Sequence, residues 1–134
     1  LFTFDMGDIE REAFQRFFDS LSPTFGHMIS LGQSNTIVSC PSLTTHSELN
    51  EEALKDSGLT PTTVRCAVGD EDPIDLIRHF VHAARGTIDL ARPGYSDGFM
   101  NEADTRQMIR DRYTATHSAH VESQLERSGG EPWF

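Results

Sequence analysis

The spacing of hydrophobic positions along the chain predicts short strands that alternate with amphipathic helices. Phe2 and Phe4 alternate with more polar neighbours, which is typical of a short strand. Between residues 9 and 21, apolar residues recur three or four positions apart and predict a helix with an aromatic face, for which Asp8 is a candidate cap. The members of this face are Ala13, Phe14, Phe17, Phe18 and Leu21.

The following segment predicts a second strand, a loop and a short acidic helix. Residues 27–32 form the strand, which runs into a glycine turn, and residues 34–46 combine a short apolar piece with a loop. A helix is predicted for residues 48–57. Ser47 is its candidate N-cap, and Gly58 stands where a glycine often ends a helix.

The third predicted strand, residues 62–69, places a charged residue in an apolar run. By alternation, Val64 and Cys66 share one face, while Arg65 shares the other with the small Ala67. A permanently charged guanidinium on a strand of this kind needs a partner, because an unpaired buried charge costs on the order of 3 to 5 kcal/mol. Arg65 is therefore the first candidate functional residue.

The C-terminal half changes character along its length. The Asp-Pro pair at 72–73 predicts the start of an amphipathic helix. From Gly86 the chain is rich in glycine, proline and aspartate, which predicts an irregular connector. Asn101 is the candidate N-cap of a long tail helix with a thin apolar stripe. We expect one domain over residues 1–85, followed by a connector and tail helix over residues 86–134.

Short strands among helices with one apolar face predict a small α/β fold, a short-stranded sheet with helices packed on one face. The net charge of −10 would repel nucleic acid and anionic membrane surfaces. No apolar run approaches the roughly 18 residues of a membrane helix, and the first residues do not resemble a signal peptide. Cys40 and Cys66 lack metal or redox spacing and favour buried free thiols in a reducing compartment, although a disulfide between them stays open.

Five short motifs follow one another within residues 28–80. They are Ser30-Leu31-Gly32, Pro41 with Thr44-Thr45-His46-Ser47, the acidic helix ending at Gly58, Val64-Arg65, and Val68-Gly69 followed by acids. Their order and spacing resemble the C-terminal domain of the pyridoxal-phosphate (PLP) enzymes of cysteine and methionine metabolism, the transsulfuration family. This family includes cystathionine synthases and lyases, methionine gamma-lyase and O-acetylhomoserine sulfhydrylases.

The resemblance extends over residues 1–85, because the strand and helix of residues 1–21 are similar to the opening of that domain. It implies the small C-terminal domain of the fold-type-I PLP-dependent transferase class. The chain departs from the family in small ways. Cys66 and Ala67 stand where leucine and serine are common, and Cys40 stands where histidine is common.

The resemblance implies that Arg65 binds the α-carboxylate of an amino-acid substrate. A planar carboxylate accepts two parallel hydrogen bonds from a guanidinium, which fixes its orientation. Ser30 resembles the serine beside that carboxylate, although a lone serine there would be an ordinary turn residue. Thr45 either supports the arginine or caps the following helix. Without the resemblance, a salt bridge from Arg65 to Asp70, Asp72 or a helix acid is the simpler interpretation.

The resemblance also implies PLP, which such enzymes bind as a Schiff base to a lysine. The only lysine is Lys55, on the acidic helix, and neither the family's lysine motif nor a phosphate-binding loop is visible. We therefore expect PLP to be held by a domain that is not present in this chain, which alone would not be catalytic. His117 and His120, with Glu122, could reach a metal ion from one turn of the tail helix, but solvated histidines on a polar helix are the favoured interpretation. The acids after Gly69 lack the spacing and the glycine of an EF-hand loop, so we expect no metal site.

The whole enzyme implied by the resemblance would catalyse β- or γ-elimination or replacement on cystathionine, methionine or an O-acylhomoserine. Its partners would be the substrate carboxylate, the PLP-binding domain and further copies of itself in a cytoplasmic homo-oligomer. The alternative is a free-standing, non-catalytic interaction or ligand-sensing module that keeps the same fold. The long tail helix and the excess of arginine over lysine favour this alternative mildly.

Overall fold

The structure is a computed structural model that describes residues 1–29, 32–127 and 129. The chain divides into two compact units, Leu1–Phe99 and Met100–Phe134. The second unit contains the long helix α4 (Glu102–Arg127). Its start agrees with the predicted cap, because the side-chain oxygen of Asn101 accepts a hydrogen bond from the Asp104 amide at 2.9 Å.

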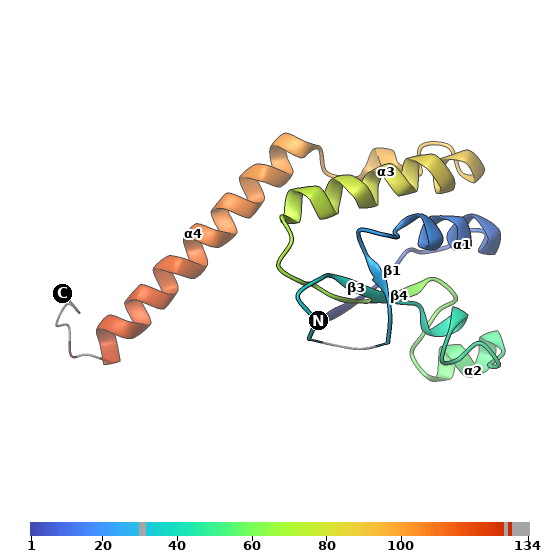
Figure 1. Cartoon of the computed structure of the whole chain (residues 1–134), viewed down its shortest axis with the longest axis horizontal. Helices are drawn as coiled ribbons and strands as arrows, with labels where there is room; N and C mark the ends of the chain where they lie inside the picture. Colours follow the sequence, from blue (N-terminus) through green and yellow to red (C-terminus); the bar gives the residue numbers. More distant parts are fainter. Residues whose placement is uncertain (30–31, 128, 130–134) are drawn as a thin grey trace. The chain divides into compact units, whose positions relative to one another are not determined.

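Among the described residues of the first unit, four strands form one mixed sheet (Figure 1). Strand β4 is central and runs antiparallel to both neighbours, β1 and β3, while β2 pairs with β3 in parallel. The parallel pair joins segments separated by a loop, so periodicity alone does not predict it. The strands are β1 (Phe2–Asp5), β2 (Gly26–His27), β3 (Ile37–Ser39) and β4 (Thr63–Ala67), in the order β1-β4-β3-β2.

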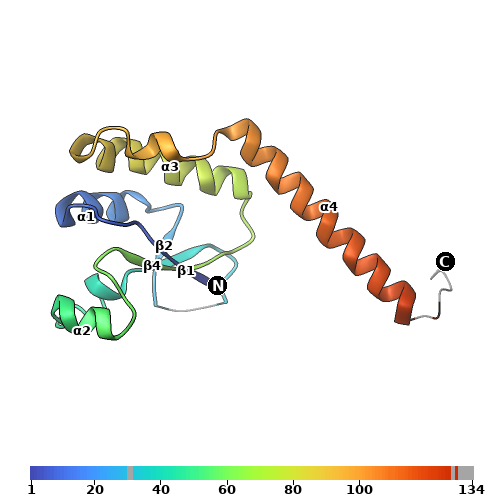
Figure 2. The ribbon, with the colours of Figure 1, turned by 180° about the vertical axis from the view of Figure 1, so that it is seen from behind.

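Two amphipathic helices cover one face of this sheet. Helices α1 (Arg11–Ser20) and α3 (Pro73–Ala91) pack against each other on that face, and the short α2 (Glu51–Asp56) lies on the other side (Figure 2). The predicted α/β arrangement with helices on one face therefore holds for α1 and α3 but not for α2. Two 3-10 turns, η1 (Pro41–Leu43) and η2 (Tyr95–Gly98), complete the unit.

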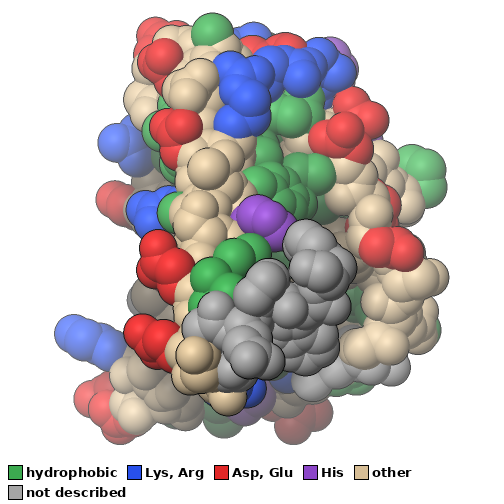
Figure 3. Space-filling view, turned by 90° about the vertical axis from the view of Figure 1, so that its left-hand side faces the viewer, with side chains coloured by type: hydrophobic (Ala, Val, Ile, Leu, Met, Phe, Trp, Pro, Cys, Tyr) green, Lys and Arg blue, Asp and Glu red, His purple; other side chains and the backbone are tan. Residues whose placement is uncertain are grey.

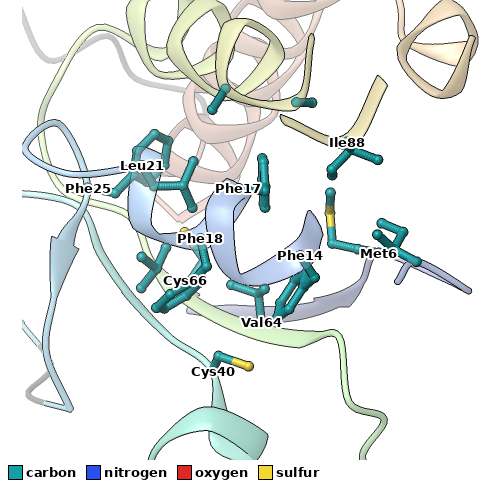
Figure 4. Close-up of a cluster of buried hydrophobic side chains, with 14 of the residues drawn as sticks. Met6, Phe14, Phe17, Phe18, Leu21, Phe25, Cys40, Val64, Cys66 and Ile88 are labelled. Carbon is teal, nitrogen blue, oxygen red and sulfur yellow. The ribbon is translucent and has the colours of Figure 1, made fainter. Parts of the chain in front are cut away.

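The core lies between the sheet and these two helices (Figure 4). Phe14 and Phe17 of α1 are at most 1% exposed, and Val64 of β4 is completely buried beneath them. Phe17 meets Phe80 of α3 edge to face, with ring centroids 5.0 Å apart. Full burial of an aromatic or aliphatic side chain contributes roughly 1.5 to 3 kcal/mol, so this cluster is the main source of stability.

The ends of α2 follow the sequence signals only in part. The prediction that Ser47 caps α2 is wrong, because the helix starts later. The Asn50 side chain takes the cap position and accepts a hydrogen bond from the Ala53 amide at 2.9 Å. Gly58 ends the helix as predicted. Its φ of 72° is in the left-handed region, and its amide donates to the Lys55 carbonyl at 2.9 Å.

The two long helices of the first unit begin differently. The predicted cap Asp8 is wrong for α1, which begins at Arg11 with Glu10 in the cap position and no side-chain hydrogen bond to the helix end. For α3 the predicted start at Asp72-Pro73 is confirmed, since the Asp72 carboxylate accepts a hydrogen bond from the Ile74 amide at 2.7 Å.

The irregular connector predicted from Gly86 starts later than expected. Helix α3 continues through Gly86 to Ala91, and Ile88 in its last turns is completely buried. Glycine inside a helix costs only about 1 kcal/mol relative to alanine, which the burial of Ile88 offsets. The following turn is also bonded to the residue after β1, because the Tyr95 hydroxyl donates a hydrogen bond to the Met6 carbonyl at 2.8 Å. No helix in the described part of the chain has the length and apolar character of a membrane span.

Candidate functional site

Arg65 occupies the middle of the central strand β4. Its backbone faces Thr3 of β1 on one side and Ser39 of β3 on the other. Because side chains alternate along a strand, Val64 and Cys66 point into the core and Arg65 points to the opposite face, where it is partly buried. The predicted alternation around Arg65 is confirmed.

A backbone carbonyl orients the guanidinium of Arg65. The Nη2 atom donates a hydrogen bond to the carbonyl oxygen of Ile29 at 3.1 Å. Among residues 1–29, 32–127 and 129, no carboxylate forms an ion pair with this arginine. A guanidinium has five N–H donors, so most of them remain for a ligand.

The predicted salt-bridge partners of Arg65 are occupied elsewhere or exposed. Asp72 caps helix α3 through the Ile74 amide, and the side chain of Asp70 is exposed. The interpretation of Arg65 as one half of a structural ion pair therefore finds no partner in the described part of the chain. What remains is a partly buried guanidinium, hydrogen-bonded to the Ile29 carbonyl, on the sheet face away from α1 and α3.

The other two predicted site residues have different outcomes. Ser30 lies outside the described residues. Thr45 is exposed, and its hydroxyl lies 2.8 Å from Nδ1 of His46. Thr45 is also not the cap of α2, because Asn50 takes that position. A role of Thr45 in supporting the arginine stays a prediction from the resemblance.

Sequence reasoning missed a polar cluster between the loop before β3 and the turn after β4. The Glu71 carboxylate accepts two hydrogen bonds from Thr36, from its amide and from its hydroxyl, both at 2.7 Å. The Gly69 amide donates to the same hydroxyl at 2.9 Å, and the Asp70 amide donates to the Ser34 carbonyl at 2.8 Å. We call Ser34, Thr36, Gly69 and Glu71 the Thr36–Glu71 cluster.

The cluster keeps Glu71 ionised. Burial by itself raises the pKa of this carboxyl, but the hydrogen bonds from the Thr36 amide and hydroxyl outweigh burial and lower the pKa below its ordinary value. In the sequence, Glu71 is one of several acidic residues near the start of a predicted helix. No spacing signal reveals its role, because Thr36 is 35 residues away along the chain.

An apolar cavity of about 380 Å³ opens on the opposite face of the sheet from Arg65. Its lining includes Phe4, Val38, Cys66 and Phe80. Burial raises the pKa of the Cys66 thiol, which disfavours the reactive thiolate. Both Cys66 and Cys40 are buried free thiols. This cavity therefore offers little for acid–base or nucleophilic chemistry.

Figure 3 shows one face of the molecule, on which apolar, acidic and basic side chains are all exposed. The chain carries a net charge of −10, which disfavours the approach of an anion at long range. A carboxylate would therefore need a local arginine such as Arg65 to bind. The described residues contain no group of three histidine, cysteine or acidic side chains placed to hold a metal ion.

Residues 1–85 match the model of the Cys/Met metabolism PLP-dependent enzyme family. This match covers more than half of the 134 residues, and the chain belongs to that family. The O-acetyl-L-homoserine sulfhydrylase 1 of Thermus thermophilus is 37% identical over 65 residues, which are 48% of this chain and 15% of that protein.

A solved structure supports the same relationship. The protein described as an O-acetylhomoserine (thiol)-lyase from Campylobacter jejuni, which contains a pyridoxyl-lysine phosphate, is 34% identical with a TM-score of 0.52. The match covers 62% of this chain and 19% of that one. A cystathionine gamma-lyase from Micromonospora echinospora is 36% identical with a TM-score of 0.48, covering 54% and 19% of the two chains. The chain thus spans less than a fifth of the length of these relatives.

The described residues do not themselves fit PLP. A Schiff-base lysine needs a pocket that encloses the cofactor, but Lys55, the only lysine, is exposed in the last turn of α2. It does not line the apolar cavity described above. No chemical step through PLP can be assigned to the described residues.

Proposed function

We propose that this chain is the substrate-carboxylate-binding C-terminal domain of a PLP-dependent enzyme of sulfur amino-acid metabolism. The enzyme would catalyse β- or γ-elimination or replacement on cystathionine, methionine or an O-acylhomoserine. One observation carries the proposal: Arg65 lies partly buried within the family-matched segment, oriented by the Ile29 carbonyl and without an acidic partner among the described residues.

The geometry of Arg65 suits an incoming carboxylate. The contact with Ile29 uses one N–H of Nη2 and restrains the plane of the guanidinium. The donors that remain can engage both oxygens of a carboxylate in parallel. Fixing the carboxylate orients the substrate, and correct orientation is a large part of the work of a PLP enzyme, because the bond to be broken must be aligned with the cofactor ring.

The remaining parts of the proposal lie outside the described site. We assign PLP to a domain beyond this chain, and we expect the chain alone to be inactive. Ser30 and Thr45 stay in the proposal as residues that the resemblance implies near Arg65. Assembly into a cytoplasmic homo-oligomer is likewise part of the proposal.

The size and colour of the native protein test the enzyme assignment. An antibody against this segment should detect a species several times larger than 15.0 kDa, and the purified species should absorb near ~420 nm as PLP aldimines do. A colourless native species of 15.0 kDa would refute the enzyme assignment. It would favour the interaction or ligand-sensing module, which keeps the fold without chemistry.

Substitution of Arg65 tests the binding role in the whole enzyme. Hydrogen bonds to charged groups contribute about 1.5 to 3 kcal/mol, so Arg65→Ala should lower kcat/KM roughly 100-fold, mainly through KM. Arg65→Lys should recover only part of this loss, because an ammonium cannot form the parallel pair of hydrogen bonds. Arg112→Ala removes the same charge from an exposed position on α4 and should leave kcat/KM unchanged.

A further inference from the structure

The Thr36–Glu71 cluster holds two loops in close contact. A Cβ on Gly69 would lie 2.3 Å from the Ser34 carbonyl oxygen and 2.6 Å from a Glu71 carboxylate oxygen, so no side chain fits there. Thr36 is completely buried at the same point and bonds to both Gly69 and Glu71. The loop before β3 therefore packs directly against the turn after β4.

Thr36 also links this cluster to strand β2. Its carbonyl oxygen accepts a hydrogen bond from the Gly26 amide at 2.8 Å, which is the first contact of the parallel pairing between β2 and β3. Strand β2 is only two residues long and lies at the edge of the sheet. So short an edge strand contributes few hydrogen bonds of its own, and its position depends on the residues that anchor its partner.

The end of β2 leads directly to Arg65. The Met28 amide donates to the Val38 carbonyl at 3.3 Å, and the next carbonyl, that of Ile29, receives the hydrogen bond from the Arg65 guanidinium. A continuous path of hydrogen bonds and short backbone segments thus joins Glu71 to Arg65 through Thr36 and β2.

We propose that Glu71 is a positioning residue for carboxylate binding at Arg65. The inference rests on the proposed function and deepens it. By anchoring Thr36, the Glu71 carboxylate fixes β2 and so the Ile29 carbonyl that orients the guanidinium. Without Glu71, the arginine would occupy the binding orientation for only a fraction of the time, and the apparent dissociation constant would rise by the inverse of that fraction.

The sign of the effect separates positioning from simple electrostatics. Glu71 is negatively charged, and removing a negative charge near an anion site favours anion binding. Positioning predicts the opposite result, namely weaker binding after Glu71→Ala. Asp70→Ala is a matched control, because it removes an exposed charge next to Glu71 and keeps the backbone bond from Asp70 to Ser34.

The experiment uses the ¹⁵N-labelled 134-residue chain titrated with O-acetyl-L-homoserine. The Arg65 Nε–H and Gly69 amide signals report binding, and thermal unfolding is measured on the same samples. We expect Glu71→Ala to raise Kd about tenfold. Glu71→Gln should recover part of the affinity, because its amide oxygen can still accept from Thr36. Asp70→Ala should bind as tightly as the wild type or more tightly.

The outcomes distinguish the two proposals. If the Arg65 signal of the wild-type chain does not respond to the probe, the carboxylate-binding function itself fails. If the wild type binds and Glu71→Ala binds equally well, the positioning role is wrong even where the melting temperature falls. A lower melting temperature without a change in Kd would assign Glu71 to stability alone.

Discussion

Replacing Gly69 by alanine tests how tightly the loop before β3 packs against the turn after β4. The φ angle of Gly69 is not in the left-handed region, so alanine meets no dihedral penalty there. The penalty is steric, because the new Cβ would lie 2.3 Å from the Ser34 carbonyl oxygen and 2.5 Å from the Asn35 carbonyl carbon. Both are backbone atoms, which cannot move aside without displacing the loop.

The magnitude follows from the contacts that such a displacement breaks. Overpacking at a fixed position costs about 1 to 3 kcal/mol. Moving the loop also weakens the bonds of Thr36 to Gly69 and Glu71, at roughly 1 kcal/mol net for each hydrogen bond. We expect Gly69→Ala to lower the free energy of unfolding by about 3 to 5 kcal/mol, a large part of the ~5 to 15 kcal/mol typical of a domain.

Urea unfolding followed by far-UV circular dichroism measures this loss, and Gly86→Ala provides the control. Gly86 lies in α3, and a Cβ added there meets nothing within 4 Å. Alanine at Gly86 should therefore raise the free energy of unfolding by about 0.5 to 1 kcal/mol. If Gly69→Ala unfolds within ~0.5 kcal/mol of the wild type, the value expected of a neutral substitution, the close contact between the loops is refuted.

Two further substitutions and one thiol-reactivity measurement test the core and the hydrogen bonds around Asp5. Phe17→Ala should lower the free energy of unfolding by about 3 to 5 kcal/mol in the same urea assay, and a loss below ~1 kcal/mol would contradict the packing of this completely buried ring. Burial raises the pKa of Asp5, but hydrogen bonds from Thr60, the Gly7 amide and two further threonines outweigh it and lower the pKa. The folded state therefore binds fewer protons, so the stability contributed by Asp5 is present above about pH 4 and is lost as the pH falls through its folded pKa. Asp5→Asn should lower the melting temperature at pH 7 and reduce its decline in acid, whereas an unchanged acid profile would exclude this role. Cys66 should react with a thiol reagent only after unfolding, because burial raises its pKa and covers it, and rapid reaction of the native protein would contradict this.

Local sequence signals predicted much of the local structure. Apolar spacing located the buried face of α1, and alternation placed Arg65 on the face of β4 away from the core. Both results depend only on the fixed geometry of a helix or strand. Asp72 and Gly58 marked helix ends correctly because capping involves residues within a few positions of one another.

Local signals failed where two local solutions compete or where packing extends an element. Asn50 rather than Ser47 caps α2, although both residues are suitable caps by type. Helix α3 runs through Gly86 because Ile88 beyond it is buried in the core. The choice in each case depends on contacts that neither a cap preference nor a helix propensity contains.

The amino-acid sequence by itself predicted the family, a strand at residues 62–69 and the arginine that it carries. Only the tertiary structure decided what surrounds that arginine. The parallel pairing of β2 with β3, the bond from Arg65 to Ile29 and the bonds of Glu71 to Thr36 all join residues more than ten positions apart. Such contacts leave no periodic trace in a single sequence, because they depend on how the chain folds back on itself rather than on the geometry of one element.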